Sequence, residues 1–167
     1  MRIIEAYLRD TSYQIYCDMD GVLCDFSSQF EKLSGKPEEG FTAKYGEPLF
    51  WKIVASGKMD FWTTMPWLDD GRKLWAYIKK YRPIILSSPG RNSYAPKGKR
   101  LWVRKNLGTN VLLILEQSAK KKQHANEKTI LIDDREDNVA GWKEAGGIGI
   151  VYKTANDAIN QLKRLGL

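Results

Sequence analysis

Cysteine is scarce in this chain, which has only Cys17 and Cys24 among its 167 residues. The two cysteines flank a short acidic stretch. A disulfide between them would have to span a loop that needs to stay open for chemistry. We therefore expect free thiols in a reducing compartment.

Long hydrophobic runs are also missing. The N-terminal stretch MRIIEAYLRD is broken by Glu5 and Arg9 and lacks the apolar core of a signal peptide. No other stretch approaches the length of a membrane span. These absences predict a cytoplasmic protein with no membrane partner. Internal repeats and low-complexity tracts are absent too, and the one charge run is Lys120–Lys122.

What the chain does contain is typical of a globular domain. Its length and its hydrophobic content of 43% allow one compact domain with a core, plus a small inserted module. Its 27 Lys and Arg residues outnumber 20 Asp and Glu residues, giving a net charge of +7. Such a surplus favours a polyanionic or phosphorylated partner, although many proteins with a similar charge bind no nucleic acid.

Short apolar runs alternate with amphipathic stretches along most of the chain. This rhythm predicts a doubly wound, Rossmann-like α/β fold with a parallel sheet covered on both faces. The predicted strands are 13–17, 83–86, 111–115, 129–132 and 148–152. The predicted helices are 70–81, 97–106, 118–125, 137–145 and 154–165.

The segment 27–66 breaks this rhythm because it is rich in turn residues and aromatic side chains. Its position directly after the first strand predicts a small, mainly helical cap over the strand ends. The alternative is that its aromatic residues form a small core of their own. The predicted division is therefore a core made of 1–26 and 67–167, with 27–66 as the cap.

Asp18 and Asp20 follow the first predicted strand and are separated by one residue. Alternate residues of an extended chain point the same way, so both carboxylates can face one reaction centre. Gly21 then permits a sharp turn. The carboxyl ends of parallel strands are where such folds bind ligands.

Three further polar clusters follow other predicted strands, so all four meet at one edge of the sheet. They are Ser87 and Ser88, then Lys120–Lys122, then Asp133 and Asp134. Phosphoryl transfer through an aspartyl intermediate needs such a set. It requires a carboxylate nucleophile, oxygen ligands for Mg²⁺, and a hydroxyl and a lysine that bind the phosphoryl oxygens. A second acid exchanges protons with the leaving group and with water.

The four clusters, in this order, resemble the motifs of the haloacid dehalogenase superfamily of phosphohydrolases. The resemblance covers roughly residues 13–152. It implies that Asp18 is the nucleophile and a Mg²⁺ ligand, and that Asp20 is the acid/base, with its backbone carbonyl on the metal. It further implies that Ser87 binds the phosphoryl group and that Asp133 completes the metal site. Asp134 would either support the metal ligands from behind or bind the metal through water.

The lysine of the third cluster stays open between Lys120, Lys121 and Lys122. Lys121 is favoured because His124 and Ala125 lie three and four residues after it, on the same face of a helix. Lys120 is nearly as plausible. Which of Ser87 and Ser88 is the main phosphoryl-binding serine of the second cluster is open as well.

Longer stretches of the chain resemble the 5′(3′)-deoxyribonucleotidase family. These are DMDGVLCDF (18–26), FW (61–62), SSP (87–89), YAPKGKRLWV (94–103) and LIDDREDN (131–138). The resemblance implies that aromatic side chains stack on a nucleobase and that Lys99 helps to hold the phosphate. We also expect Ser88 to bind the substrate. The implied base-binding residues are Phe26, Phe50, Trp51, Phe61 and Trp62.

We therefore predict a Mg²⁺-dependent phosphomonoesterase that hydrolyses nucleoside monophosphates. The stretch 135–152 also resembles the phosphatase domain of phage polynucleotide kinase, so an alternative is a phosphatase of polynucleotide 3′ ends. A third possibility is a basic binding module that keeps the fold without turnover. Base and sugar preference, the position of the phosphate and the oligomeric state stay open.

Overall fold

The computed structural model of the chain describes residues 13–167. Residues 1–12 lie outside the described part. They include the beginning of the predicted core segment 1–26 and the stretch without a signal-peptide core.

Within the described part of the chain, five parallel strands form one sheet in the order β3-β2-β1-β4-β5. The order reverses at β1, which pairs with β2 on one side and with β4 on the other. The predicted doubly wound parallel sheet is confirmed, and its topological switch point lies at β1. The strands are β1 (Gln14–Cys17), β2 (Ile84–Ser87), β3 (Leu113–Leu115), β4 (Thr129–Asp133) and β5 (Ile148–Val151).

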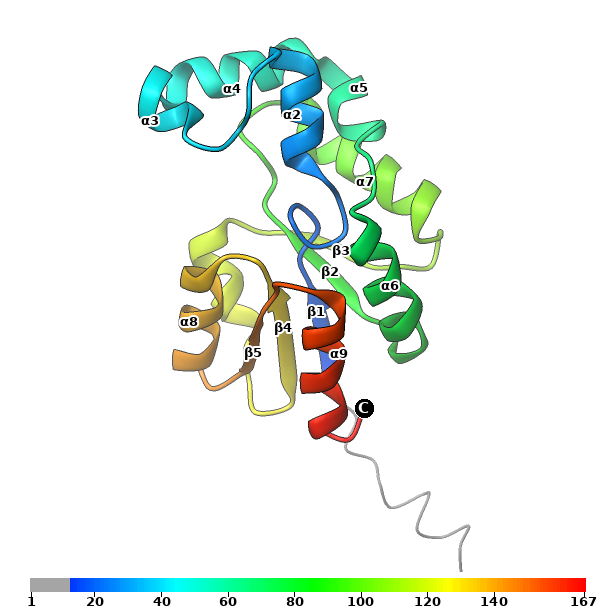
Figure 1. The fold of residues 1–167 in the computed structure, drawn as a ribbon. Coiled ribbons are helices and arrows are strands. Elements are labelled where there is room, and N and C mark those ends of the chain that lie inside the picture. Colours follow the sequence, from blue (N-terminus) through cyan, green and yellow to red (C-terminus); the bar gives the residue numbers. More distant parts are fainter. Residues whose placement is uncertain (1–12) are drawn as a thin grey trace, which may run out of the picture.

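Alternation along each strand divides the core between the two faces of the sheet. Ile130 and Ile132 of β4 belong to the larger cluster, whereas Leu131 packs in a second cluster with Trp142. The larger cluster includes residues of α6 (Asp69–Ile78), α7 (Tyr94–Asn106) and α9 (Ala155–Arg164). The second includes Trp142 of α8 (Glu136–Glu144) and Ala125, which directly follows η2 (Ser118–His124). Helices α8 and α9 flank the sheet from opposite sides (Figure 1).

Two predicted helices differ from the structure in their details. The stretch 118–125 forms the 3₁₀ helix η2 instead of an α-helix, and α7 begins at Tyr94, three residues before the predicted start. Pro96 is tolerated because it lies in the first turn of α7, where backbone N–H groups have no partner within the helix. The Asn92 side chain accepts hydrogen bonds from the N–H groups of Tyr94 and Ala95. A further 3₁₀ turn, η1 (Lys79–Tyr81), follows α6.

Four helices follow β1 and lie together at the end of the sheet where that strand ends (Figure 1). They are α2 (Phe26–Ser34), α3 (Phe41–Tyr45), α4 (Glu47–Ser56) and α5 (Lys58–Thr63). Asp25 caps α2, because its Oδ1 accepts a hydrogen bond of 2.9 Å from the Ser28 N–H. Aromatic rings join the helices, as between Phe30 and Phe50, whose centroids are 4.6 Å apart.

The structure bears on the two cysteines and on whether a helix could span a membrane. Cys17 and Cys24 are free thiols, and both are buried. Within residues 13–167, the structure has no helix with the length and apolarity that crossing a membrane requires.

Candidate active site

Asp18 directly follows strand β1 and therefore lies at the carboxyl edge of the sheet. The strand ends at Cys17, and the Asp18 N–H still donates to the carbonyl of Ile132 in β4, at 2.8 Å. This bond fixes Asp18 beside the end of β4, where Asp133 and Asp134 follow. Asp18 is 6% exposed, so its carboxylate lies in a nearly dry environment.

Gly21 permits the turn that follows. Its φ angle is +79°, a backbone conformation that residues other than glycine rarely adopt. A Cβ atom at this position would also lie 2.3 Å from Oδ2 of Asp134. The glycine therefore lets the loop after β1 approach the loop after β4.

Lys121 is the cation at the centre of the site. Its Nζ donates to Oδ1 of Asp18 at 2.9 Å and to Oδ2 of Asp133 at 2.7 Å. It is 2% exposed, whereas Lys120 and Lys122 are exposed to solvent. Of the three lysines that the sequence left open, the structure brings Lys121 to the acidic residues.

Asp133 is held from several sides. Its Oδ2 also accepts from the Asn138 side chain at 3.0 Å, and its Oδ1 accepts from the Arg135 N–H at 2.9 Å. Such bonds fix the orientation of a buried carboxylate. Asn138 was not predicted as a site residue, although it is the last residue of the stretch LIDDREDN.

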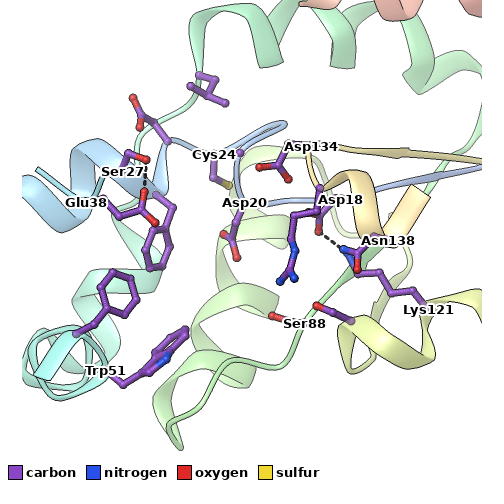
Figure 2. Close-up of a pocket in the computed structure, with 17 residues that line it drawn as sticks. Asp18, Asp20, Cys24, Ser27, Glu38, Trp51, Ser88, Lys121, Asp134 and Asn138 are labelled. Atoms are coloured by element: carbon purple, nitrogen blue, oxygen red, sulfur yellow. Dashed lines mark hydrogen bonds and ion pairs between the residues drawn. The ribbon is translucent and has the colours of Figure 1, made fainter. Parts of the chain in front are cut away.

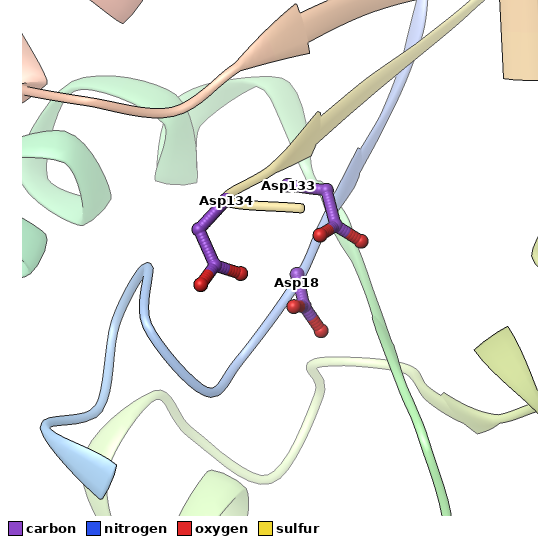
Figure 3. A group of neighbouring side chains, drawn as sticks. All are labelled: Asp18, Asp133 and Asp134. Atoms are coloured by element: carbon purple, nitrogen blue, oxygen red, sulfur yellow. The ribbon is translucent and has the colours of Figure 1, made fainter. Parts of the chain in front are cut away.

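Asp18, Asp133 and Asp134 form a group that could hold a metal ion (Figure 3). One oxygen of each carboxylate lies within 4.8 Å of the other two. Three carboxylates against the single ammonium of Lys121 leave two negative charges, which a divalent cation would balance. Oxygen ligands are the donors that Mg²⁺ prefers, so these residues fit that ion. Asp134, for which the sequence suggested a more remote contact, is a member of this group.

The acidic cluster shifts the pKa values of its members. Burial raises the pKa of Asp18 to about 8, because the opposing attraction of Lys121 is smaller and the negative charge of Asp133 adds to the rise. Burial and the charge of Asp133 raise the pKa of Asp134 to about 6. For Lys121, burial favours the neutral form, but Asp18 and Asp133 outweigh it and raise the pKa.

The two serines after β2 have different surroundings. Ser87 is fully buried, and its Oγ accepts a hydrogen bond of 3.0 Å from Lys99. Ser88 lines the cavity beside the acidic residues. Ser88 is therefore the serine that reaches the cavity wall, and direct contact of Ser87 with a phosphoryl group stays a prediction.

A cavity of about 450 Å³ opens beside the acidic residues (Figure 2). One part of its wall consists of Asp18, Asp20, Asp134 and Lys121, and another contains Phe26, Phe50 and Trp51. Ser27 and Glu38 also line it, and the Ser27 hydroxyl donates a hydrogen bond to the Glu38 carboxylate. The sequence did not predict Glu38, Ser118 or Arg135 as lining residues.

Phe61 and Trp62 do not line this cavity, contrary to the expected contact with a base. They are 3% and 1% exposed and belong to the core where α5 packs against α7. Trp62 packs against Gly98 of α7, where an added Cβ would lie 2.3 Å from the Trp62 Cβ. Of the five predicted aromatic residues, the structure brings three to the cavity.

No family model matches the chain. No curated protein matches it either. Solved structures do match. A haloacid dehalogenase superfamily hydrolase of subfamily IA from Geobacter sulfurreducens PCA has a TM-score of 0.56 and 14% identity, covering 90% of this chain and 97% of that one. A hydrolase from Streptococcus pneumoniae TIGR4 has a TM-score of 0.54 and 12% identity, covering 93% and 100%.

The chain has the fold of haloacid dehalogenase superfamily hydrolases. L-2-haloacid dehalogenase from Xanthobacter autotrophicus shares this fold with a TM-score of 0.52 and 14% identity, covering 82% of this chain and 76% of that one. One fold supports different reactions, so the reaction has to be argued from the site residues.

Proposed function

We propose that the chain is a Mg²⁺-dependent phosphomonoesterase that acts on nucleoside monophosphates, with deoxyribonucleotides as the favoured substrates. The observation that carries this proposal is the convergence of Asp18, Lys121 and the Asp133–Asp134 pair at one side of a cavity whose wall includes aromatic rings. Charged groups beside Asp18 suit a phosphoryl group, and the rings suit a base. We further propose that residues 27–66 act as the cap.

In this mechanism Asp18 attacks phosphorus. Lys121 holds Oδ1 of Asp18, so Oδ2 is the oxygen that we assign to the attack. The bond between phosphorus and the ester oxygen breaks, and the leaving oxygen takes a proton from Asp20. Asp20 then takes a proton from the water that hydrolyses the aspartyl phosphate. A bound Mg²⁺ would offset the repulsion between carboxylate and phosphate.

The test is a phosphate-release screen with nucleoside monophosphates and with end-phosphorylated oligonucleotides, each with and without Mg²⁺. We expect Mg²⁺-dependent release from the mononucleotides. Release that is unchanged in the presence of a chelator would contradict the proposed metal requirement. Absence of release from every phosphate ester would favour the basic binding module without turnover.

The alternative is a phosphatase of polynucleotide 3′ ends. Besides the net charge of +7, a second cavity of about 450 Å³ favours it, because that cavity shares Trp51, Ser88 and Arg135 with the first and also contains Arg91. Both arginines line this cavity, so a neighbouring phosphate of an oligonucleotide would meet cationic groups there. However, Arg91 already pairs with Glu47 at 3.1 Å and Arg135 with Asp137 at 2.7 Å, which weakens their attraction for a further anion.

Salt dependence distinguishes the two substrates. A polynucleotide contacts several cationic groups, so its turnover at subsaturating concentration should fall steeply with salt. A mononucleotide presents one phosphate, and its turnover should fall only weakly. A steep fall for oligonucleotides together with a higher kcat/KM for them would replace the leading proposal by the alternative.

Replacing Trp51 by alanine tests the base-binding wall. Trp51 is partly exposed and lines the cavity, and stacking on a base contributes about 1–3 kcal/mol. We expect Trp51→Ala to raise the KM for a nucleotide about tenfold, and to leave the KM for glycerol phosphate nearly unchanged. Tyr45→Ala is the matched control, since Tyr45 lies on the cap outside the cavity lining. Equal increases for both substrates would argue against stacking.

The pH dependence of Mg²⁺ binding tests the metal site. Raised pKa values of about 8 for Asp18 and about 6 for Asp134 mean that these groups hold protons that a metal ion must displace. Mg²⁺ affinity should therefore rise by at least about tenfold between pH 6 and pH 8. Titration calorimetry in buffers of different ionisation enthalpy would also detect the released protons. An affinity that is flat over this range would contradict the assignment.

A further inference from the structure

Lys99 is a fully buried lysine in the first half of α7, and its ammonium group bonds to three different groups. Its Nζ lies 2.6 Å from Oδ2 of Asp20, 3.0 Å from Oγ of Ser87 and 2.8 Å from the carbonyl oxygen of Ser88. A buried ammonium is costly unless it is paired and hydrogen-bonded, and these partners meet that need. The lysine therefore connects the loop after β1 with the end of β2.

The packing of α7 explains why this lysine lies so deep. Gly98 allows the helix to approach Trp62 closely, because a Cβ at that position would lie 2.3 Å from the Trp62 Cβ. The next residue, Lys99, then extends beside the Trp62 ring, with Nζ 5.1 Å from the ring centroid. A cation over an indole face gains further stabilisation. Trp62 thus packs against the lysine and limits its movement.

The number of donors argues against a direct role of Lys99 in phosphate binding. An ammonium group has three N–H donors, and Lys99 has three acceptors within hydrogen-bond distance. It is also absent from the lining of the cavity that contains Asp18. A phosphate would have to displace one of these bonds, so Lys99 is better suited to act through its partners.

Of the three groups that Lys99 contacts, only the Asp20 carboxyl group takes part in the proposed reaction, as its acid/base. Its Oδ2 is held by Lys99, whereas its Oδ1 is buried and has no hydrogen-bond partner among the described residues. Buried polar atoms without a partner are rare. Asp20 lines the cavity together with Asp18. Oδ1 is covered from solvent in this structure, and no described protein group competes with a substrate oxygen for it.

We propose that Lys99 is a positioning residue, which fixes the Asp20 carboxyl group so that Oδ1 can exchange a proton at the leaving-group oxygen. This inference rests on the proposed phosphomonoesterase function. As the bond from Asp18 to phosphorus forms and the ester bond breaks, the proton of Oδ1 moves to the leaving oxygen. Oδ2 stays bonded to Lys99. When water then hydrolyses the aspartyl phosphate, Oδ1 takes a proton from that water.

The test compares two phosphate esters of similar size that differ in their need for a proton. Benzyl phosphate releases a basic alkoxide, whereas p-nitrophenyl phosphate releases a stable phenoxide. General acid catalysis contributes about 10²–10⁴-fold, so Lys99→Met should lower kcat/KM for benzyl phosphate by about 100-fold. We expect a fall of less than about threefold for p-nitrophenyl phosphate. The ratio kcat/KM reports the steps through leaving-group departure.

Lys97→Met on the same helix is the matched control, because Lys97 is exposed, and it should change neither value. An equal loss for both esters in Lys99→Met, with weaker inhibition by inorganic phosphate, would overturn the proposal in favour of phosphate binding. If circular dichroism shows that Lys99→Met is unfolded, Lys99→Gln replaces it, since its amide can donate to neighbouring oxygens without the charge of the ammonium group. We then expect a smaller loss that is still selective for benzyl phosphate.

A double-mutant cycle gives a second, independent readout. If Lys99 acts through Asp20, adding Lys99→Met to Asp20→Asn should cause no further loss of kcat/KM for benzyl phosphate. Multiplicative losses would contradict the proposal. Wild-type protein that releases phosphate neither from these esters nor from nucleoside monophosphates would refute the proposed function itself, an outcome distinct from failure of the positioning role.

Discussion

Asp18→Asn should lower Mg²⁺-dependent phosphate release by at least about 10⁴-fold, as expected when the nucleophile of a covalent mechanism is removed. An amide cannot attack phosphorus at a useful rate. The fold should remain intact, because asparagine has the size of aspartic acid. Burial raises the pKa of Asp18 to about 8, so a neutral group is already favoured at this position in the absence of metal. Phosphate release and thermal unfolding measure the two effects.

Asp69→Asn is the control for this experiment. Asp69 is an exposed carboxylate in the first turn of α6, away from the cavity lining, so its loss should leave activity near the wild-type level. Full activity in Asp18→Asn would remove the covalent mechanism. Loss of the folded state in that variant would instead show that the carboxylate is required for stability.

Lys121→Met should reduce both stability and activity. The ammonium is 2% exposed and bonds to Asp18 and Asp133, so its removal leaves buried carboxylates without their cation. Breaking such a buried pair costs about 3–5 kcal/mol, which urea unfolding would measure at neutral pH. Loss of a cation that stabilises developing charge should lower kcat by at least about 100-fold.

Lys120→Met and Lys122→Met are the matched controls, since both neighbours are exposed. Each should change the free energy of unfolding by less than about 0.5 kcal/mol. The substitutions also test the choice among the three lysines. If Lys120→Met abolished activity while Lys121→Met left it unchanged, the arrangement around Asp18 would be wrong.

The sequence was sufficient to predict the sheet and the meeting of its strand ends. Five apolar runs separated by helical patterns imply parallel strands, and parallel strands place their carboxyl ends on one edge. We could therefore expect the side chains of Asp18, Asp133 and Lys121 to meet, although they follow different strands. In the structure, Lys121 bonds to both carboxylates, and the two carboxylates are close enough to share a metal ion.

The exposure of the aromatic residues could not be predicted in the same way. Helix α5 has only six residues, too few for a clear apolar periodicity. Phe61 and Trp62 are adjacent in it and therefore point in different directions, yet both are buried, because residues on different sides of the helix cover them. Phe61 packs against Phe26 of α2, and Trp62 packs against Gly98 of α7. These contacts depend on how the helices pack.

Local sequence patterns also did not show which of two adjacent polar residues reaches the cavity. Ser87 and Ser88 are adjacent at the end of β2, so they point to opposite sides, and the position of Lys99 determines which hydroxyl is covered. For Asp133 and Asp134, the close approach of Gly21 brings the second carboxylate to the cavity. Both outcomes depend on contacts between distant segments.

The most direct test of the central claim is to trap the intermediate. The protein is mixed with a nucleoside monophosphate and Mg²⁺, quenched in acid within the first turnover, and digested for mass spectrometry. The account predicts a phosphoryl adduct on Asp18, formed only when Mg²⁺ is present. Phosphate release without any adduct, or an adduct on a different residue, would contradict it.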